Sequence, residues 1–128
     1  MEKYKKNREL ENRIISFSVE VIDLCESLKN SFSGSHLGKQ LIRSSTSSAL
    51  NYGETPGAES PRDFIHKLSV VTKELRESLV NIKIINRSKK IKVDNKQIEY
   101  LEDECNQLVA IFVSSIKTAK QNLRKDDM

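Results

Sequence analysis

The sequence has no tryptophan and few residues that break helices or cross-link chains. Its 128 residues include two cysteines, two prolines and four glycines, and only 5% are aromatic. So few glycines and prolines leave few places for turns, which predicts a small number of long elements. Two cysteines, both at apolar helical positions, favour small core residues over a disulfide or a metal site.

Long apolar runs are also missing. No window approaches the roughly 20 apolar residues that a membrane-spanning helix needs. The opening residues MEKYKKNRELENR contain no apolar segment of the kind found in secretion signals. We therefore expect a cytoplasmic protein with no membrane partner.

The sequence is rich in charged residues, which make up 31% of it, against 37% hydrophobic residues. This balance is typical of amphipathic helices around one core, and the length suits a single domain over residues 1–128. The net charge of +4 favours acidic partners without identifying one.

Apolar residues recur every three or four positions, which predicts four amphipathic helices, at about residues 7–31, 36–54, 61–88 and 94–123. The predicted caps are Ser35, Ser60 with Pro61 at the first helical position, and Asp94 with Gln97 as its capping-box partner. The four apolar stripes run through Leu10, Ile14, Phe17, Val21, Leu24 and Leu28; Leu37, Leu41 and Ile42; Phe64, Leu68, Val71, Leu75, Ile82 and Ile85; and Ile98, Leu101, Cys105, Leu108 and Phe112. Flanking apolar residues that should widen these stripes are Ile15, Val19, Ile22, Cys25, Ile65, Leu79, Val109, Val113 and Ile116.

Four such helices with short connections can bury their stripes only against one another. The sequence therefore predicts an all-α fold, an antiparallel up-and-down four-helix bundle.

The second predicted helix changes character in the stretch 43-RSSTSSALNYGE-54. Ser44, Ser47, Asn51 and Glu54 follow the spacing of Leu37 and Leu41, so a polar line should continue the core-facing stripe. Three interpretations remain open: a polar packing seam, a contact for a ligand or nucleic acid, or a catalytic carboxylate at Glu54. If buried, these side chains need hydrogen-bond partners, with Arg43, Tyr52 or another helix as candidates.

Catalytic and metal-binding patterns are scarce. His36 and His66 are isolated, and neither a zinc-protease motif nor a glycine-rich phosphate loop occurs. His66 follows Asp63 by three residues, which is compatible with a metal pair, but a surface histidine beside a capping acid is the favoured interpretation. We expect no enzyme, no cofactor and no metal.

The run 40-QLIRSSTSSALNYGE-54 resembles the signature of bacterial four-helix bundle proteins encoded in intervening sequences of 23S ribosomal RNA genes. A second match lies at 63-DFIHKLSVVTKELRES-78. The matching residues are Gln40, Leu41, Arg43, Ser47, Asn51 and Glu54 in the first stretch, and Asp63, Phe64, Ile65, Leu68, Ser69, Leu75 and Glu77 in the second. The chain departs from the pattern at Ser44, Ser45, Ser48 and Thr55.

The pattern at Lys73, Glu74, Arg76 and Glu77 is similar to a branch that includes accessory proteins of diversity-generating retroelements. The resemblance implies a homo-oligomer of five subunits, no established enzymatic activity and an RNA-associated role. It therefore implies a family and a genomic setting more than a mechanism.

Basic residues should gather at both ends of such a bundle and could hold the phosphates of RNA. One end would receive Lys5, Lys6, Arg8, Lys117, Lys120 and Arg124, and the other the connector residues Arg87, Lys89, Lys90 and Lys92. The alternative is an adaptor or scaffold for a protein partner, such as a reverse-transcriptase-type polymerase.

Overall fold

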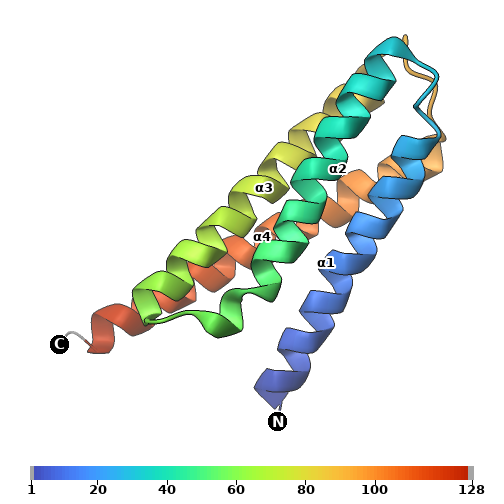
Figure 1. Ribbon diagram of the computed structural model, residues 1–128. Helices are drawn as coiled ribbons and strands as arrows, with labels where there is room; N and C mark the ends of the chain where they lie inside the picture. Colours follow the sequence, from blue (N-terminus) through green and yellow to red (C-terminus); the bar gives the residue numbers. More distant parts are fainter. Residues whose placement is uncertain (1, 127–128) are drawn as a thin grey trace.

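The computed structural model describes the backbone of residues 2–126 and the side chains of residues 5 and 7–125. Its elements in chain order are α1 (Glu2–Glu26), α2 (Phe32–Gly53), the short 3-10 helix η1 (Thr55–Gly57), α3 (Pro61–Arg87) and α4 (Asn95–Asp126). The four long helices run alternately in opposite directions, and the two termini lie at the same end (Figure 1). The predicted all-α, antiparallel up-and-down bundle is confirmed.

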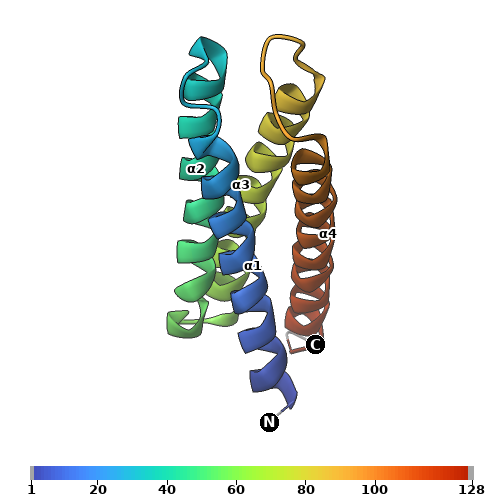
Figure 2. The same ribbon diagram turned by 90° about the vertical axis from the view of Figure 1, so that its right-hand side faces the viewer.

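The helices pack in a cycle. Each packs closely against its neighbours in sequence, and α4 also packs against α1, whereas in the described part of the chain no Cα atom of α1 lies within 8 Å of one of α3. Seen from the side, the α1–α2 turn and the α3–α4 connector share the end opposite the termini (Figure 2). Arg13 of α1 joins Glu104 of α4 through two hydrogen bonds of 2.6 and 2.9 Å, which helps to close the cycle.

The first two helix boundaries differ from the prediction. α1 begins before residue 7 and ends at Glu26, because residues 27–30 form a turn in which the amide of Leu28 bonds the carbonyl of Cys25 at 3.0 Å. The cap of α2 is Ser31, whose side chain accepts the amide of Gly34 at 3.1 Å. The choice of Ser35 was wrong, since its amide already bonds the carbonyl of Ser31 inside the helix.

The later caps agree with the prediction. Ser60 accepts the amide of Asp63 at 3.0 Å, and Pro61 is the first residue of α3. The Asp94 carboxylate accepts the amide of Gln97 at 2.9 Å. Each cap satisfies an amide that would otherwise lack a partner in the first turn.

The core contains most of the predicted stripe residues. In α1 and the turn after it, the residues that are at most 1% exposed include Ile14, Phe17, Val21, Leu24 and Leu28. Cys25 and Cys105 are buried free thiols, and burial raises the pKa of each to about 12. Tyr52, in the last turn of α2, meets Phe112 of α4 edge to face with ring centroids 5.2 Å apart.

Some apolar residues predicted to be covered are exposed instead. A helix in a single bundle has neighbours on one side only, so the flanks of a wide apolar stripe remain uncovered, and Phe64 of the predicted stripe lies in the first turn of α3, at the end of the bundle. The exposed fractions are 45% for Ile15, 51% for Val19, 37% for Ile22, 37% for Phe64 and 40% for Val113.

No described helix is both long and apolar enough to cross a membrane.

Candidate functional site

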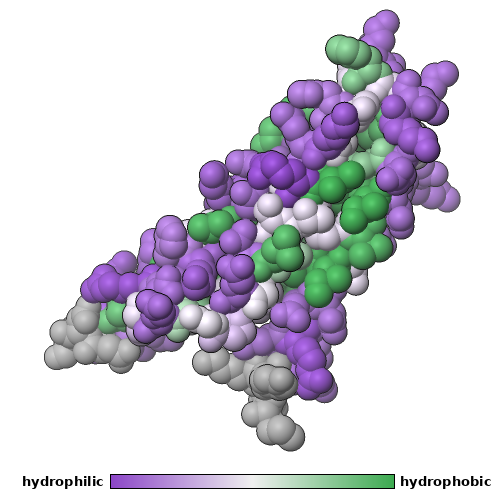
Figure 3. Space-filling view, viewed as in Figure 1, coloured by the Kyte–Doolittle hydropathy of each residue, from purple (hydrophilic) through white to green (hydrophobic). Residues whose placement is uncertain are grey.

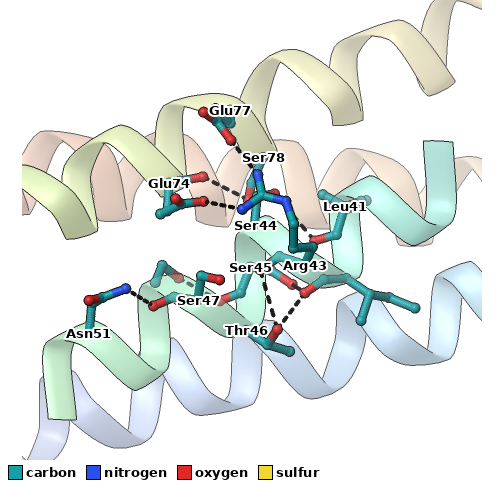
Figure 4. A network of polar contacts seen from close by, with 12 residues as sticks. Leu41, Arg43, Ser44, Ser45, Thr46, Ser47, Asn51, Glu74, Glu77 and Ser78 are labelled. Carbon is teal, nitrogen blue, oxygen red and sulfur yellow. Dashed lines mark hydrogen bonds and ion pairs between the residues drawn. The ribbon is translucent and has the colours of Figure 1, made fainter. Parts of the chain in front are cut away.

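The buried polar line on α2 consists mainly of small hydroxyl side chains. Ser44, Ser45 and Ser48 are at most 2% exposed, and they continue the line of Leu41 toward Tyr52. Each hydroxyl bonds a carbonyl three residues earlier on its own helix (Figure 4), so it enters the core without an unsatisfied donor. The serine run is therefore compatible with burial.

Two contacts connect this line to neighbouring helices. The hydroxyls of Ser44 and Ser78 lie 2.7 Å apart between α2 and α3. On the other side, Ser18 of α1 donates to the backbone carbonyl of Ser45 at 3.0 Å. A contact with a backbone carbonyl requires close approach of the helices, which the small serine side chains permit.

Arg43 joins α2 to two carboxylates on α3. Its guanidinium lies 3.3 Å from Glu74 and 2.6 Å from Glu77 (Figure 4). The Glu74 side chain is 11% exposed, whereas that of Glu77 is 43% exposed. Arg43 therefore provides the positive charge beside a largely buried carboxylate.

The predicted core positions of Asn51 and Glu54 were wrong. Asn51 is half-buried and donates to the carbonyl of Ser47 on its own helix at 2.8 Å, and Glu54 is exposed. Successive helical residues are about 100° apart, so the buried line passes through Ser48 and Tyr52, one position beyond Ser47 and Asn51. Gln40 is also exposed.

Asp63 acts at the start of α3. Its carboxylate accepts the amide of Glu59 at 3.0 Å and lies 3.7 Å from the ammonium of Lys67. Among the described side chains, no group of three or more His, Cys, Asp or Glu could hold a metal ion.

The connector between α3 and α4 displays its cations outward. Ile91 is 4% exposed and anchors the segment in the core, while Lys90 and Lys92 on either side of it are exposed. Arg87 and Lys89 are exposed as well. Residues 87–92 thus carry four cations and no acidic residue.

The opposite end carries the second predicted cluster. Lys5, Arg8, Lys117, Lys120 and Arg124 are exposed there, and the side chain of Lys6 lies outside the described residues. Lys120 and Arg124 line one hollow of about 430 Å³ together with Arg62, Ile65 and Leu123. Arg62 was not among the predicted basic residues, although it lies in the first turn of α3, at the end of the bundle where α4 finishes.

Together these observations define an all-α four-helix bundle with a serine-lined helix contact and cationic ends. The model of the family described as 23S rRNA-intervening sequence protein matches residues 6–114, and the chain belongs to this family. The matched region includes the α2 and α3 stretches that carried the resemblance and the basic connector.

One similar solved structure is a protein of unknown function from the S23 ribosomal protein family of Bacteroides thetaiotaomicron VPI-5482. It is 27% identical in sequence, with a TM-score of 0.76, and the match covers 84% of this chain and 98% of the solved one. A comparison with curated proteins finds no match.

Proposed function

We propose that this protein is a non-enzymatic homo-oligomer that associates with RNA through its basic ends. The observation that carries the proposal is the connector, where buried Ile91 holds a segment with four exposed cations and no acid at one end of the bundle. Ordered cations of this kind can neutralise phosphates, and their affinity should depend strongly on salt.

The hollow at the other end supports the same proposal. Three basic residues, Arg62, Lys120 and Arg124, line it together with apolar side chains. Cations on several elements can contact a backbone without reading base edges, so the expected recognition is of RNA shape and phosphates. The family description, which refers to an intervening sequence of 23S rRNA, agrees with an RNA association.

Assembly would multiply the charge. Five copies of a chain of net charge +4 carry 5 × 4 = +20, with each basic end repeated around the assembly. Such a field attracts a polyanion more strongly than one protomer does. The serine-lined contact and the Arg43 ion pairs then have a structural role, holding α2 against α3.

The experiment is charge reversal in the connector. The variant Lys89→Glu/Lys90→Glu/Lys92→Glu should bind RNA more weakly than the native protein, and the slope of log affinity against log salt should fall by roughly two to three. Helicity and oligomer mass should stay unchanged, because these side chains are exposed. RNA binding that is undiminished would remove the connector from the proposal.

A control separates local contacts from net charge. Lys83→Glu alters the net charge by as much as Lys90→Glu, but it lies within α3, outside the connector. The single Lys90→Glu substitution should weaken RNA binding, and Lys83→Glu should leave it nearly native. Equal losses would indicate a nonspecific effect of charge.

The alternative function is an adaptor for a protein partner, such as a polymerase of the reverse-transcriptase type. The exposed apolar residues of α1 and α3, which include Val19 and Val80, favour a protein contact of some kind. Two results together would support the adaptor: a protein partner stays bound after nuclease treatment and a high-salt wash, and the purified protein itself does not bind RNA.

A further inference from the structure

An apolar stripe on α1 has no cover within the protomer. Ile15, Val19 and Ile22 are 45%, 51% and 37% exposed, and their spacing of four and three residues places them along one line of the helix. The half-buried Ile42 and Ala49 of α2 also pack at the edge of the core. Figure 3 shows hydrophobic surface gathered over the middle of α1 and its border with α2, between hydrophilic ends. We call Ile15, Val19 and Ile22 the α1 face.

A second apolar surface lies along α3. Val80 and Ile84, one helical turn apart, are 57% and 49% exposed. They line an open groove of about 930 Å³, together with residues of α2 and α4 that include Leu37, Val113 and Ile116. We call this groove the α3 groove.

One residue that lines the groove has a buried polar atom without a partner. Asn81 lines it and is only 8% exposed; its amide nitrogen donates to the carbonyl of Leu37 at 3.1 Å. Its carbonyl oxygen is buried without a hydrogen-bond partner. This oxygen has almost no accessible surface, so it lies in the packing between α2 and α3 and not on the open wall of the groove.

The charges beside the two surfaces are opposite. Asp23 and Glu26 are exposed, and they lie four and seven residues after Val19, hence on the same side of α1. The α3 groove is lined by the cations Lys73, Arg76 and Lys120, besides the Arg43–Glu77 pair. An apolar face with acids at one end therefore matches an apolar groove bordered by cations.

We propose that the α1 face of one copy docks into the α3 groove of a second copy. The two surfaces belong to helices with no Cα atoms within 8 Å of each other, and both surfaces are exposed, so they do not cover each other in one chain. The contact is heterologous, joining different patches of the two copies, and each copy keeps one patch free for a further neighbour. This inference rests on the proposed homo-oligomer and names the surfaces that form it.

The first test places an acid in each surface. Val19→Asp puts a charge in the centre of the α1 face, and Val80→Asp puts one in the groove facing the acids of the docked helix. By light scattering, each variant should have the 14.6 kDa mass of one protomer at a concentration where the native protein forms a larger species. Each should keep native helicity, because both positions are exposed. The control Phe32→Asp alters a residue that is 96% exposed and lies in neither surface, so its mass should stay native.

The second test is a mixture of the two variants. The Val19→Asp chain keeps its groove and the Val80→Asp chain keeps its α1 face, so one intact contact can form between them. An equimolar mixture should give a species of twice the 14.6 kDa protomer mass that neither variant forms alone. A contact between identical patches would give no such complex.

The outcomes separate the inference from the proposed function. A native protein that is itself a protomer of 14.6 kDa overturns both the inference and the proposed oligomer. A native oligomer that persists in Val19→Asp or Val80→Asp, or variants that fail to combine, overturns the inference alone. RNA binding is measured separately and depends on the connector.

Discussion

Replacement of Arg43 by alanine should destabilise the protein by about 2 kcal/mol, mostly through Glu74. The Glu74 side chain is only 11% exposed, so losing its cation at 3.3 Å leaves a largely desolvated carboxylate without compensation. An unsatisfied buried polar group costs about 1–3 kcal/mol, and more if it is charged. Because the Arg43 side chain is 58% exposed and water can approach, we place the expected loss in the middle of that range.

The matched control is Glu77→Gln, which breaks the shorter but more exposed of the two ion pairs. The Glu77 side chain is 43% exposed, and exposed pairs contribute about 0.2–1 kcal/mol, so its loss should be smaller. The double variant Arg43→Ala/Glu74→Gln should recover part of the Arg43→Ala cost, because the buried charge is then absent.

The assay is urea unfolding followed by circular dichroism, at one protomer concentration because assembly couples to stability. The free energy of unfolding of each variant is compared with that of the native protein. Equal costs for Arg43→Ala and Glu77→Gln, or no recovery in the double variant, would refute the role given to Glu74.

Two further predictions concern the helix contacts and the core thiols. A Cβ at Gly34 would lie 2.9 Å from the carbonyl oxygen of Leu28, so Gly34→Ala should lower the free energy of unfolding by about 1–3 kcal/mol. Gly53 has open space around it, so Gly53→Ala should leave the free energy of unfolding equal or raise it by up to about 1 kcal/mol. The reverse order in thermal or urea unfolding would contradict the packing described for the α1–α2 turn. Burial raises the pKa of Cys25 and Cys105 to about 12, so the folded state favours the protonated thiols. Their contribution to stability is fully present below the ordinary thiol pKa of about 8.5, and it is lost as the pH rises toward 12. The free energy of unfolding should therefore fall above about pH 9, and it should fall less in a Cys25→Ala/Cys105→Ala variant. A disulfide reagent should react slowly with both thiols until urea unfolds the chain. Rapid reaction of both thiols in the native state would contradict their burial.

Most of the fold could be predicted from spacing. The line from Ile14 to Leu28 identified the buried side of α1, because a helix with one core has one face to bury. Local cap chemistry identified the starts of α3 and α4, but the segment before and within the first turn of α2, 31-SFSGS-35, contains three serines, and Ser35 was the wrong one. Because α1 already ends at Glu26, α2 begins earlier than predicted and its cap is Ser31.

The candidate site was less predictable. Asn51 and Glu54 kept a heptad-like spacing, yet the buried line shifted by one residue, to Ser48 and Tyr52, where α2 meets α1 and α3. Exposure of Val19 could not be predicted from its own helix, since the same apolar flank would suit a core or a contact with another chain. Asn81 appeared as an ordinary helical residue, and only the packing around it revealed the unpartnered oxygen.

RNA association is the central claim, and its most direct test is binding of the purified, nuclease-treated protein to structured ribosomal RNA and to duplex DNA of equal length. Affinities are measured at low salt and near the physiological ionic strength of about 0.15 M. We predict RNA binding that persists at the higher salt and exceeds binding to DNA. Binding to neither, or equal binding to both that disappears with salt, would contradict the claim and leave only the general attraction of a basic protein for polyanions.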